Sequence, residues 1–278
     1  MTRRVDHPGP IASDRSHIVQ TPGQSLSLTL APGVPLDQAI AAAMADACCD
    51  SAWLEIEDAA VDRLTYVIPA EAPDRDQVAW YSDERHLGGP GRIDRLGMVV
   101  GRDSGASFLH GHGLWTPAGG SQAMGHVLAA KTVLAAPAKA RGIGLDAARF
   151  DRLPDPETHF SLFHPVRTGP ELGDHAALRL APNQDFATAL DGAVAQLGWE
   201  AAQVHGIGSL IGARFEGGHE LSSIPSEFLV THGTAGDPDA AAEIAIVGTD
   251  PADMLRGTLS RGDNPILITA EIILERLT

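Results

Sequence analysis

The sequence contains little cysteine, few aromatic residues and too little positive charge to balance its acids. Its two cysteines are Cys48 and Cys49. Because they are neighbours, they make a poor disulfide framework and a poor metal clip, and we interpret both as small core residues. Aromatic residues make up 5% of the chain and show no regular interleaving with basic residues. The sequence therefore lacks the stacking surface of a protein that binds single strands.

The formal net charge is −16 at pH 7, and such a field repels the phosphate backbones that DNA-binding proteins attract. We therefore expect no nucleic-acid partner. No apolar run of signal-peptide length follows the start of the chain, and none approaches the ~20 residues that cross a bilayer. We expect a cytoplasmic protein with no membrane partner. Its 44% hydrophobic and 20% charged residues are ordinary for a globular fold.

An internal repeat organises what is present. Leu30-Ala31-Pro32 recurs 150 positions later as Leu180-Ala181-Pro182, and the surrounding hydrophobic patterns match in order. Both copies predict a strand, a turn, an amphipathic helix and a second strand. The paired predictions are strands at 26–30 and 176–180, helices at 36–47 and 186–197, and strands at 52–56 and 202–206.

The repeat predicts two similar α/β domains. We expect an N-terminal extension at 1–24, a first domain at 25–148, a linker at 149–174 that is rich in Pro, Asp and Gly, and a second domain at 175–278. A long polar segment at 71–91 carries Trp80 and Tyr81. Loops of this length are often functional.

Three histidines give the strongest chemical signal. His110 and His112 are two residues apart in a predicted strand, so both imidazoles point to the same face, and His126 follows on the next strand. Three imidazoles with an open fourth position are typical of a catalytic metal site, and zinc is the divalent transition metal we expect. We expect glycines 111, 113 and 125 to leave room beside the ligands. The alternatives are a structural histidine pair and a metal-free acid–base cluster.

The matching region of the second copy, counted back from Gly257, has Ala242, Ile244 and Thr258 where the three histidines stand. These side chains cannot bind a metal ion in the same way. The sequence therefore predicts one metal site, in the first copy.

The histidine pattern resembles that of the plants-and-prokaryotes conserved (PPC) domain, in which HxHxxL precedes a Gly-Gly-His. Here Trp115 replaces the leucine and Met124 the first glycine. In the second copy, residues 206–209 are similar to the family's Gly-Ile-Gly-Ser segment, and 227–229 to its later Glu-containing strand. In the first copy Ile56 and Asp58 stand in place of those glycines.

The resemblance implies an α/β (α+β) fold in which each domain is a mainly antiparallel sheet flanked by helices. It also implies metal binding by the three histidines and a homotrimeric assembly, here a trimer of tandem chains.

The two copies retain different parts of the family pattern, which suggests a composite site. We expect the first copy to bring the metal and the second a Gly-rich turn whose backbone N–H groups hold an anion. His205 and Glu227 are the candidate catalytic groups. Ser209, Arg214 and Trp115 are the candidate substrate-binding residues.

The function predicted from these features is a metal-dependent hydrolase or lyase that acts on a small polar or carboxylated metabolite through an activated water. Arg92, Arg95 and Arg214 are candidate partners for a substrate carboxylate. The alternatives are a ligand sensor or metal-stabilised assembly without turnover, and a DNA-associated regulatory protein, which the acidic charge disfavours.

Overall fold

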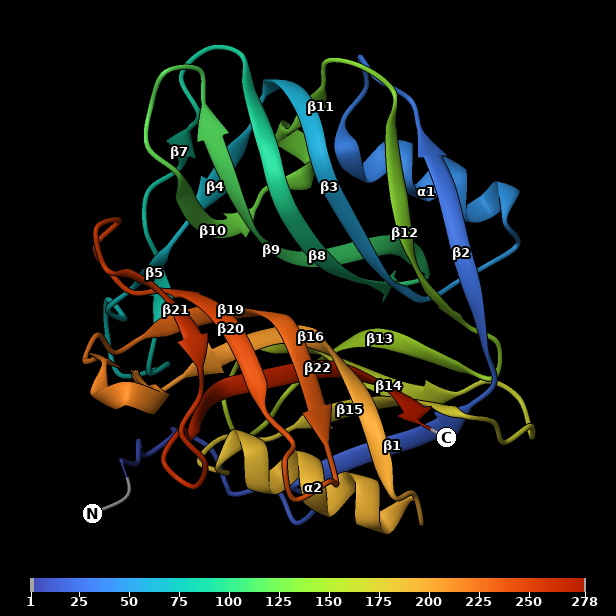
Figure 1. Cartoon of the computed structure of the whole chain (residues 1–278), viewed down its shortest axis with the longest axis vertical. Coiled ribbons are helices and arrows are strands. Elements are labelled where there is room, and N and C mark those ends of the chain that lie inside the picture. The colour runs from blue at the N-terminus through green and yellow to red at the C-terminus, as the bar shows by residue number, and fades with distance from the viewer. Residues whose placement is uncertain (1–2, 278) are drawn as a thin grey trace.

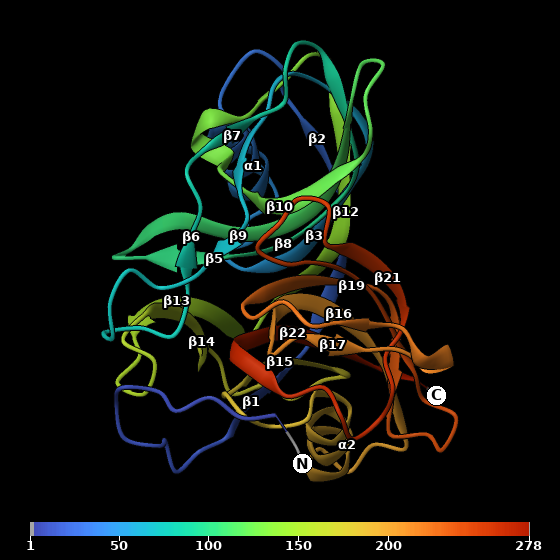
Figure 2. The same ribbon diagram turned by 90° about the vertical axis from the view of Figure 1, so that its left-hand side faces the viewer.

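The computed structural model describes residues 3–277, so Met1, Thr2 and Thr278, at the ends of the predicted extension and second domain, lie outside the described residues. Two large, mainly antiparallel sheets stack on each other, and each curves around one helix (Figures 1 and 2). The helices are α1 (Leu36–Asp46) and α2 (Phe186–Gln196). The label α/β is therefore too loose for a chain built chiefly of antiparallel strands.

The larger sheet has an eight-strand path with three further strands attached. In spatial order the path is β2 (Gly23–Leu30), β12 (Ala138–Leu145), β3 (Ala52–Arg63), β8 (Gly91–Asp103), β9 (Ala106–Pro117), β10 (Ala123–Val127), β4 (Thr65–Val67) and β7 (Arg85–His86). The attached strands are β11 (Val133–Leu134), β13 (Ala148–Pro154) and β14 (Ser161–Arg167).

The smaller sheet has seven strands. Their spatial order is β1 (Ser16–Thr21), β15 (His175–Leu180), β22 (Ile266–Leu277), β16 (Ala201–Leu210), β19 (Ser226–Ala235), β20 (Ala242–Val247) and β21 (Met254–Thr258). Two short hairpins stand apart, β5 (Pro69–Ala70) with β6 (Trp80–Tyr81), and β17 (Ala213–Arg214) with β18 (Glu220–Leu221). Two single turns of 3-10 helix are η1 (Ala129–Lys131) and η2 (Glu216–Gly218).

Six strands follow the same spatial order in both sheets. The path β2-β12-β3-β8-β9-β10 in residues 23–145, which we call the N-terminal half, parallels β15-β22-β16-β19-β20-β21 in residues 175–277, the C-terminal half. The predicted strands at 26–30, 52–56, 176–180 and 202–206 and both predicted helices are confirmed.

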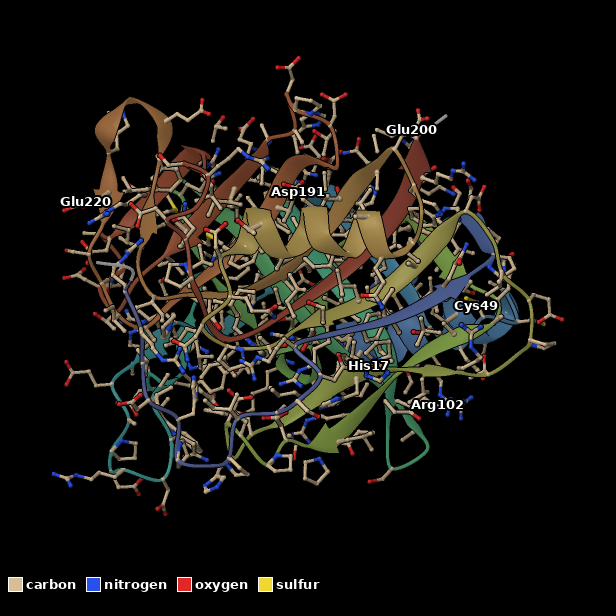
Figure 3. The ribbon with its side chains drawn as sticks, turned by 90° about the horizontal axis from the view of Figure 1, so that it is seen from below. His17, Cys49, Arg102, Asp191, Glu200 and Glu220 are labelled. Carbon is tan, nitrogen blue, oxygen red and sulfur yellow. The ribbon has the colours of Figure 1, made fainter. Side chains whose placement is uncertain are left out.

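The helices form where apolar residues recur every three or four positions. Leu36, Ile40 and Met44 are buried on one face of α1. In α2 the side chain of Asp185 accepts a hydrogen bond from the backbone N–H of Thr188, which caps the first turn. Figure 3 shows α2 across the outer face of the smaller sheet. Among residues 3–277, no helix combines the length and apolarity needed to span a bilayer.

Two segments outside the repeat differ from expectation. The predicted N-terminal extension carries β1, which pairs antiparallel with β15 and so adds an edge strand to the smaller sheet. The segment 149–174, expected to be a linker, forms most of the β13–β14 hairpin, with Asp151 beside Arg102 of β8. Pro156 lies in the turn between the two strands, and Gly169, Pro170 and Gly173 follow β14, while the strands supply their own hydrogen bonds.

A buried ion pair joins the β13–β14 hairpin to the smaller sheet. Arg179 Nη2 lies 2.7 Å from Asp155 Oδ2, and both residues are buried. The other carboxylate oxygen of Asp155 accepts hydrogen bonds from the backbone N–H and hydroxyl of Thr158. His164 lies 3.8 Å from Asp155. Burial first, then the charge of Arg179, lowers the pKa of His164 to about 4.

This low pKa predicts a loss of stability in acid. Between pH 6.5, the ordinary pKa of histidine, and about 4, the unfolded chain binds a proton at His164 that the folded protein does not, so stability falls as pH falls through this window. The free energy of unfolding is measured in urea at pH 7 and pH 5. Its change between these pH values is expected to be smaller in His164→Asn than in the wild type, by the contribution of at most one bound proton. The control is His219→Asn at an exposed position, and His164→Asn is expected to change the pH dependence more than this control does. Equal slopes for His164→Asn and wild type would contradict this assignment.

Candidate metal centre

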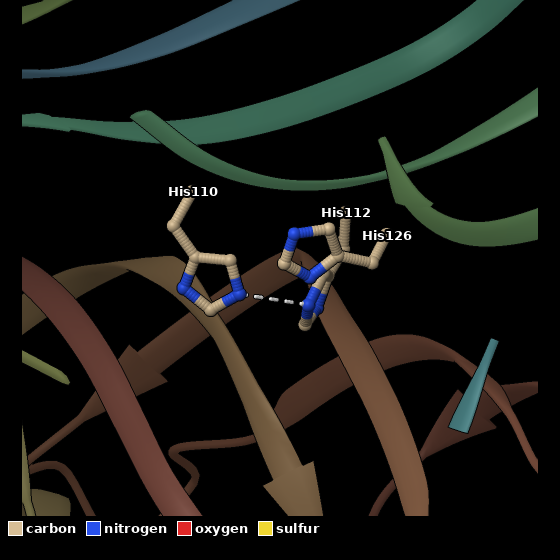
Figure 4. A group of neighbouring side chains, drawn as sticks. All are labelled: His110, His112 and His126. Atoms are coloured by element: carbon tan, nitrogen blue, oxygen red, sulfur yellow. Dashed lines mark hydrogen bonds between the residues drawn. The ribbon is translucent and has the colours of Figure 1, made fainter. Parts of the chain in front are cut away.

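The three histidines meet on the face of the larger sheet that is turned toward the C-terminal half. His110 and His112 lie on β9, and His126 lies on β10 directly opposite His112 in the strand pairing. Their ring centroids are 4.8 to 5.5 Å apart. Figure 4 shows the three imidazoles reaching from the strands of one sheet toward those of the other. The expected convergence of His110, His112 and His126 is confirmed as a three-histidine cluster.

Two of the imidazoles are held by the C-terminal half. His110 Nδ1 lies 2.7 Å from Glu271 Oε2, and His112 Nδ1 lies 2.8 Å from the backbone oxygen of Phe228. Both oxygens are acceptors, so each Nδ1 carries the proton and donates it. In the neutral form of each ring, Nε2 is then a lone-pair atom, and the two Nε2 atoms lie 3.1 Å apart.

Two lone pairs facing each other across 3.1 Å repel, so either a proton on one Nε2 or a metal ion must lie between them. Two nitrogens bound to one tetrahedral zinc ion at ~2.05 Å lie about 3.4 Å apart. One ligand nitrogen from each of the three histidines falls within 4.8 Å of the other two. His126 Nδ1 is buried without a hydrogen-bond partner. These residues therefore fit a divalent metal ion.

Burial and neighbouring charges set the protonation of the cluster. Burial lowers the pKa of His112 to about 3, so its ring is neutral near pH 7, as a metal ligand must be. Burial also disfavours the charged form of His110, but the charge and hydrogen bond of Glu271 outweigh it and raise the pKa of this imidazole. For Glu227, burial is outweighed by His112 and His126, and the pKa of the carboxyl is lowered.

Glu227 is the candidate catalytic residue that the structure places at the centre. Its Oε1 lies 3.6 Å from His112 Nε2 and 3.9 Å from His126 Nδ1. Its Oε2 is buried and makes no hydrogen bond. A buried carboxylate oxygen without a donor is costly unless a ligand or a metal supplies the missing partner. Glu227 is thus positioned where its carboxylate could bind a metal ion or accept a proton.

Ser209 lies beside this carboxylate, because it is the direct strand partner of Glu227 in the β16–β19 pairing. Its hydroxyl oxygen accepts a hydrogen bond from the backbone N–H of Ile268 and borders the cavity next to the histidines. Tyr81 covers the other side, with its ring 5.1 Å from that of His126. The segment 71–91 therefore contributes to the site.

Three other predicted site residues lie away from the histidine cluster, namely His205, Arg214 and Trp115. His205 is four residues before Ser209 on β16, roughly 13 Å along a strand, and it lines a separate cleft of about 620 Å³ with Trp53 and Glu275. Arg214 is exposed and forms ion pairs with Asp263 and Glu220. Its charge is therefore already neutralised on the protein surface.

Trp115 is fully buried on the opposite face of β9, where its ring contacts that of Tyr66 at 4.8 Å. This follows from alternation, because residue 115 has the opposite parity to the histidines. Arg92 and Arg95 are likewise paired, with Asp94 and Glu55 respectively. In residues 3–277 none of the predicted substrate-binding arginines lines the cavity beside the histidines.

The glycine expectations are corrected as well. Residues 206–209 form part of strand β16, hydrogen-bonded between β19 and β22, so their backbone N–H groups belong to a sheet and not to an anion-binding turn. Gly111 and Gly113 give room to the sheet and not to the ligands. A Cβ atom would lie 2.6 Å from Met98 Cγ at the first and 2.8 Å from the Arg95 oxygen at the second.

The strand register also changes the comparison of the two halves. His126 pairs with His112, whereas Thr258 pairs with Glu243 and Gly257 pairs with Ile244. The counterpart of His112 is therefore Glu243 rather than Ile244, because the turn between the strands is one residue longer. Within the described residues, the three-histidine cluster in the N-terminal half has no equivalent in the C-terminal half.

Glu271 is the site residue that the sequence reasoning missed. It is buried and is flanked by the apolar residues Ala270 and Ile272 in β22. A lone carboxylate in a buried apolar strand requires a partner, and this was the available signal. Its partner is contributed by the other half of the chain, which local sequence patterns do not reveal.

No protein-family model and no curated protein sequence matches this chain. Among solved structures it is similar to a metal-containing protein from Archaeoglobus fulgidus (19% identity, 52% of this chain and 96% of that chain, TM-score 0.41). It is also similar to a plant- and prokaryote-conserved (PPC) protein from Pyrococcus horikoshii (14%, 56% and 99%, 0.39). A third is a candidate DNA-binding protein from Ralstonia eutropha JMP134 (18%, 49% and 88%, 0.39). These proteins match about half of this chain, and their descriptions apply to them.

The contact between Glu271 and His110 predicts that Glu271 strengthens metal binding. Glu271→Gln is expected to reduce zinc affinity roughly 10- to 100-fold, because an outer carboxylate orients the imidazole and raises its basicity. Competition with a chromophoric chelator measures this affinity, and circular dichroism checks folding. The matched control is Glu243→Gln on the exposed side of β20. Equal zinc affinities for Glu271→Gln and this control would contradict the assigned role.

Proposed function

We propose that the protein is a metal-dependent enzyme of the hydrolase or lyase class, with His110, His112 and His126 holding a divalent transition metal such as zinc. The observation that carries the proposal is the facing pair of Nε2 atoms beside a buried carboxylate with an unpartnered oxygen. When bound, the metal supplies a Lewis acid that activates water or polarises a carbonyl oxygen.

The protein groups have distinct roles in this proposal. Glu271 and the backbone oxygen of Phe228 fix the ring orientations of His110 and His112. Glu227 is the general base, because its free Oε2 is buried beside the cluster and its lowered pKa keeps it ionised near pH 7. Tyr81 and its hairpin restrict access of solvent over His126.

The proposal divides the site between the two halves. The N-terminal half supplies the metal ligands, and the C-terminal half supplies the base and the residue that orients His110. In this form the composite site predicted from the sequence is retained, with Glu227 and Glu271 in place of an anion-binding turn. Two specialised copies of one domain would account for this division. Assembly of three chains remains a separate prediction, which the mass of the purified protein tests.

Elemental analysis of the purified protein tests whether the three histidines bind a metal ion. About one transition-metal ion per chain is expected in the wild type, with loss in His110→Ala, His112→Ala and His126→Ala. The control is His205→Ala, which removes a histidine from the separate cleft. A folded wild type that takes up no zinc, iron, manganese or nickel would contradict the proposal. An oligomer that falls apart on chelation would instead favour a structural metal.

The substitution Glu227→Gln tests whether Glu227 acts as the general base. The substitution keeps the shape of the side chain and removes its charge, so a loss of roughly 10²- to 10⁴-fold in kcat is expected in a screen of esters, lactones and amides, with metal content unchanged. Glu243→Gln is the control. Loss of metal together with activity would make Glu227 a ligand, and unchanged kcat would remove it from the mechanism.

A further inference from the structure

A small cavity adjoins the imidazoles of His110 and His112. Its volume is about 60 Å³, several times the roughly 10–15 Å³ that holds one water molecule. Most of its wall is apolar and comes from three distant parts of the chain, which place Trp80, Phe160, Leu162, Leu267 and Ile268 around it.

These apolar residues form a packed surface. Leu162, Leu267 and Ile268 belong to one small core cluster, and Phe160 packs against it. The rings of Trp80 and Phe160 are 6.0 Å apart, which is within the range of favourable aromatic contact. The wall is therefore continuous with buried side chains of the protein and is suited to an apolar ligand group.

The polar groups of the wall are few, and most are already used. Ser209 accepts from the Ile268 N–H, and the Ser226 hydroxyl donates to the backbone oxygen of Leu210. Thr269 Oγ1 is different, because it is buried and has no hydrogen-bond partner. A ligand with one hydrogen-bonding group would satisfy this hydroxyl.

The charges disfavour an anionic ligand in this cavity. Among the described residues, no lysine or arginine lines it, whereas the carboxyl group of Glu227 does. A carboxylate directed away from the histidines, into the apolar part of the cavity, would be desolvated with no lysine or arginine on the wall to pair with it. This argues against the polar or carboxylated metabolite expected from the sequence.

We propose that the site accepts a compact, uncharged substrate whose small apolar acyl or aryl group occupies the cavity between Trp80, Phe160 and Leu267. Thr269 forms a hydrogen bond with a polar atom of that substrate. This inference rests on the proposed function, because it assigns the substrate class of the same metal site. Phe160 and Thr269 are its specificity-determining residues.

Calorimetric titration of the zinc-loaded protein with three hydroxamates tests the preference. Acetohydroxamate carries the metal-binding group alone, benzohydroxamate adds an aryl group, and the monohydroxamate of succinate adds a carboxylate. Benzohydroxamate is expected to bind at least about tenfold more tightly than either of the others, which requires burial of roughly 55 Å² of apolar surface. Equal affinities, or tightest binding of the carboxylated probe, would overturn the proposal.

Substitutions in the cavity wall test which residues produce the preference for benzohydroxamate. Phe160→Ala is expected to lower benzohydroxamate affinity about five- to tenfold and to leave acetohydroxamate affinity within twofold. Thr269→Val keeps the shape of the side chain and removes its hydroxyl. It should lower the affinity of any hydroxamate that forms a hydrogen bond with that hydroxyl. Leu153→Ala, an exposed apolar position on β13, is the control. A Phe160→Ala variant that affects all three hydroxamates equally would contradict a specific contact with the aryl group.

Zinc uptake is measured first, because it tests the metal site separately from the proposed substrate class. If zinc binds and the hydroxamates show no aryl preference, the substrate class is wrong and the metal proposal stands. If zinc does not bind, the proposed function fails. The cavity is then tested on the metal-free protein by ligand-observed NMR with benzamide, acetamide and succinamate. Binding of benzamide that Phe160→Ala abolishes supports the apolar cavity, and absence of that preference overturns it.

Discussion

The hydrogen bond between His110 and Glu271 depends on the close stacking of the two sheets, and the candidate site depends on it in turn. Both side chains are largely removed from water, and they belong to opposite halves of the chain. A buried carboxylate without a partner is strongly unfavourable, and a buried imidazole N–H also needs an acceptor. Stacking of the sheets satisfies both groups and also brings Glu227 and the backbone oxygen of Phe228 to His112.

This arrangement makes the interface between the halves more than a hydrophobic contact. The core cluster of the N-terminal half extends across it to Ile207, Leu229 and Ile273, so apolar burial provides the stability. The histidines and carboxylates at the same interface provide polar groups that are fixed in position. A site held between two packed sheets is more rigid than one built on loops, which suits the fixed ligand geometry that a metal requires.

Local features of the fold and site could be predicted from the sequence. Alternation and helical periodicity located the repeated strands and helices, because each of these signals is contained within a few residues. The three-histidine cluster was predictable for the same reason, since His110 and His112 share a strand and His126 is on the next one. The β13–β14 hairpin was missed because Pro and Gly at its turns resemble a linker.

The rest depended on contacts between distant segments. Glu271 could not be assigned before its position opposite His110 was known, although its place in an apolar strand marked it as unusual. His205 was placed in the same candidate site as Ser209, but distance along an extended strand separates the two. Trp115 was assigned to the substrate site without regard to strand alternation, which places it on the other face.

The proposed function requires one metal ion that binds between the sheets, on ligands from one half and against carboxylates from the other. Anomalous X-ray diffraction from crystals of the zinc-loaded protein, collected on both sides of the zinc absorption edge, tests it most directly. We expect one strong peak per chain within about 2.0–2.1 Å of a nitrogen of each of His110, His112 and His126, with Glu271 still bonded to His110. A peak elsewhere, or a zinc-loaded structure in which the three rings point apart, would contradict it.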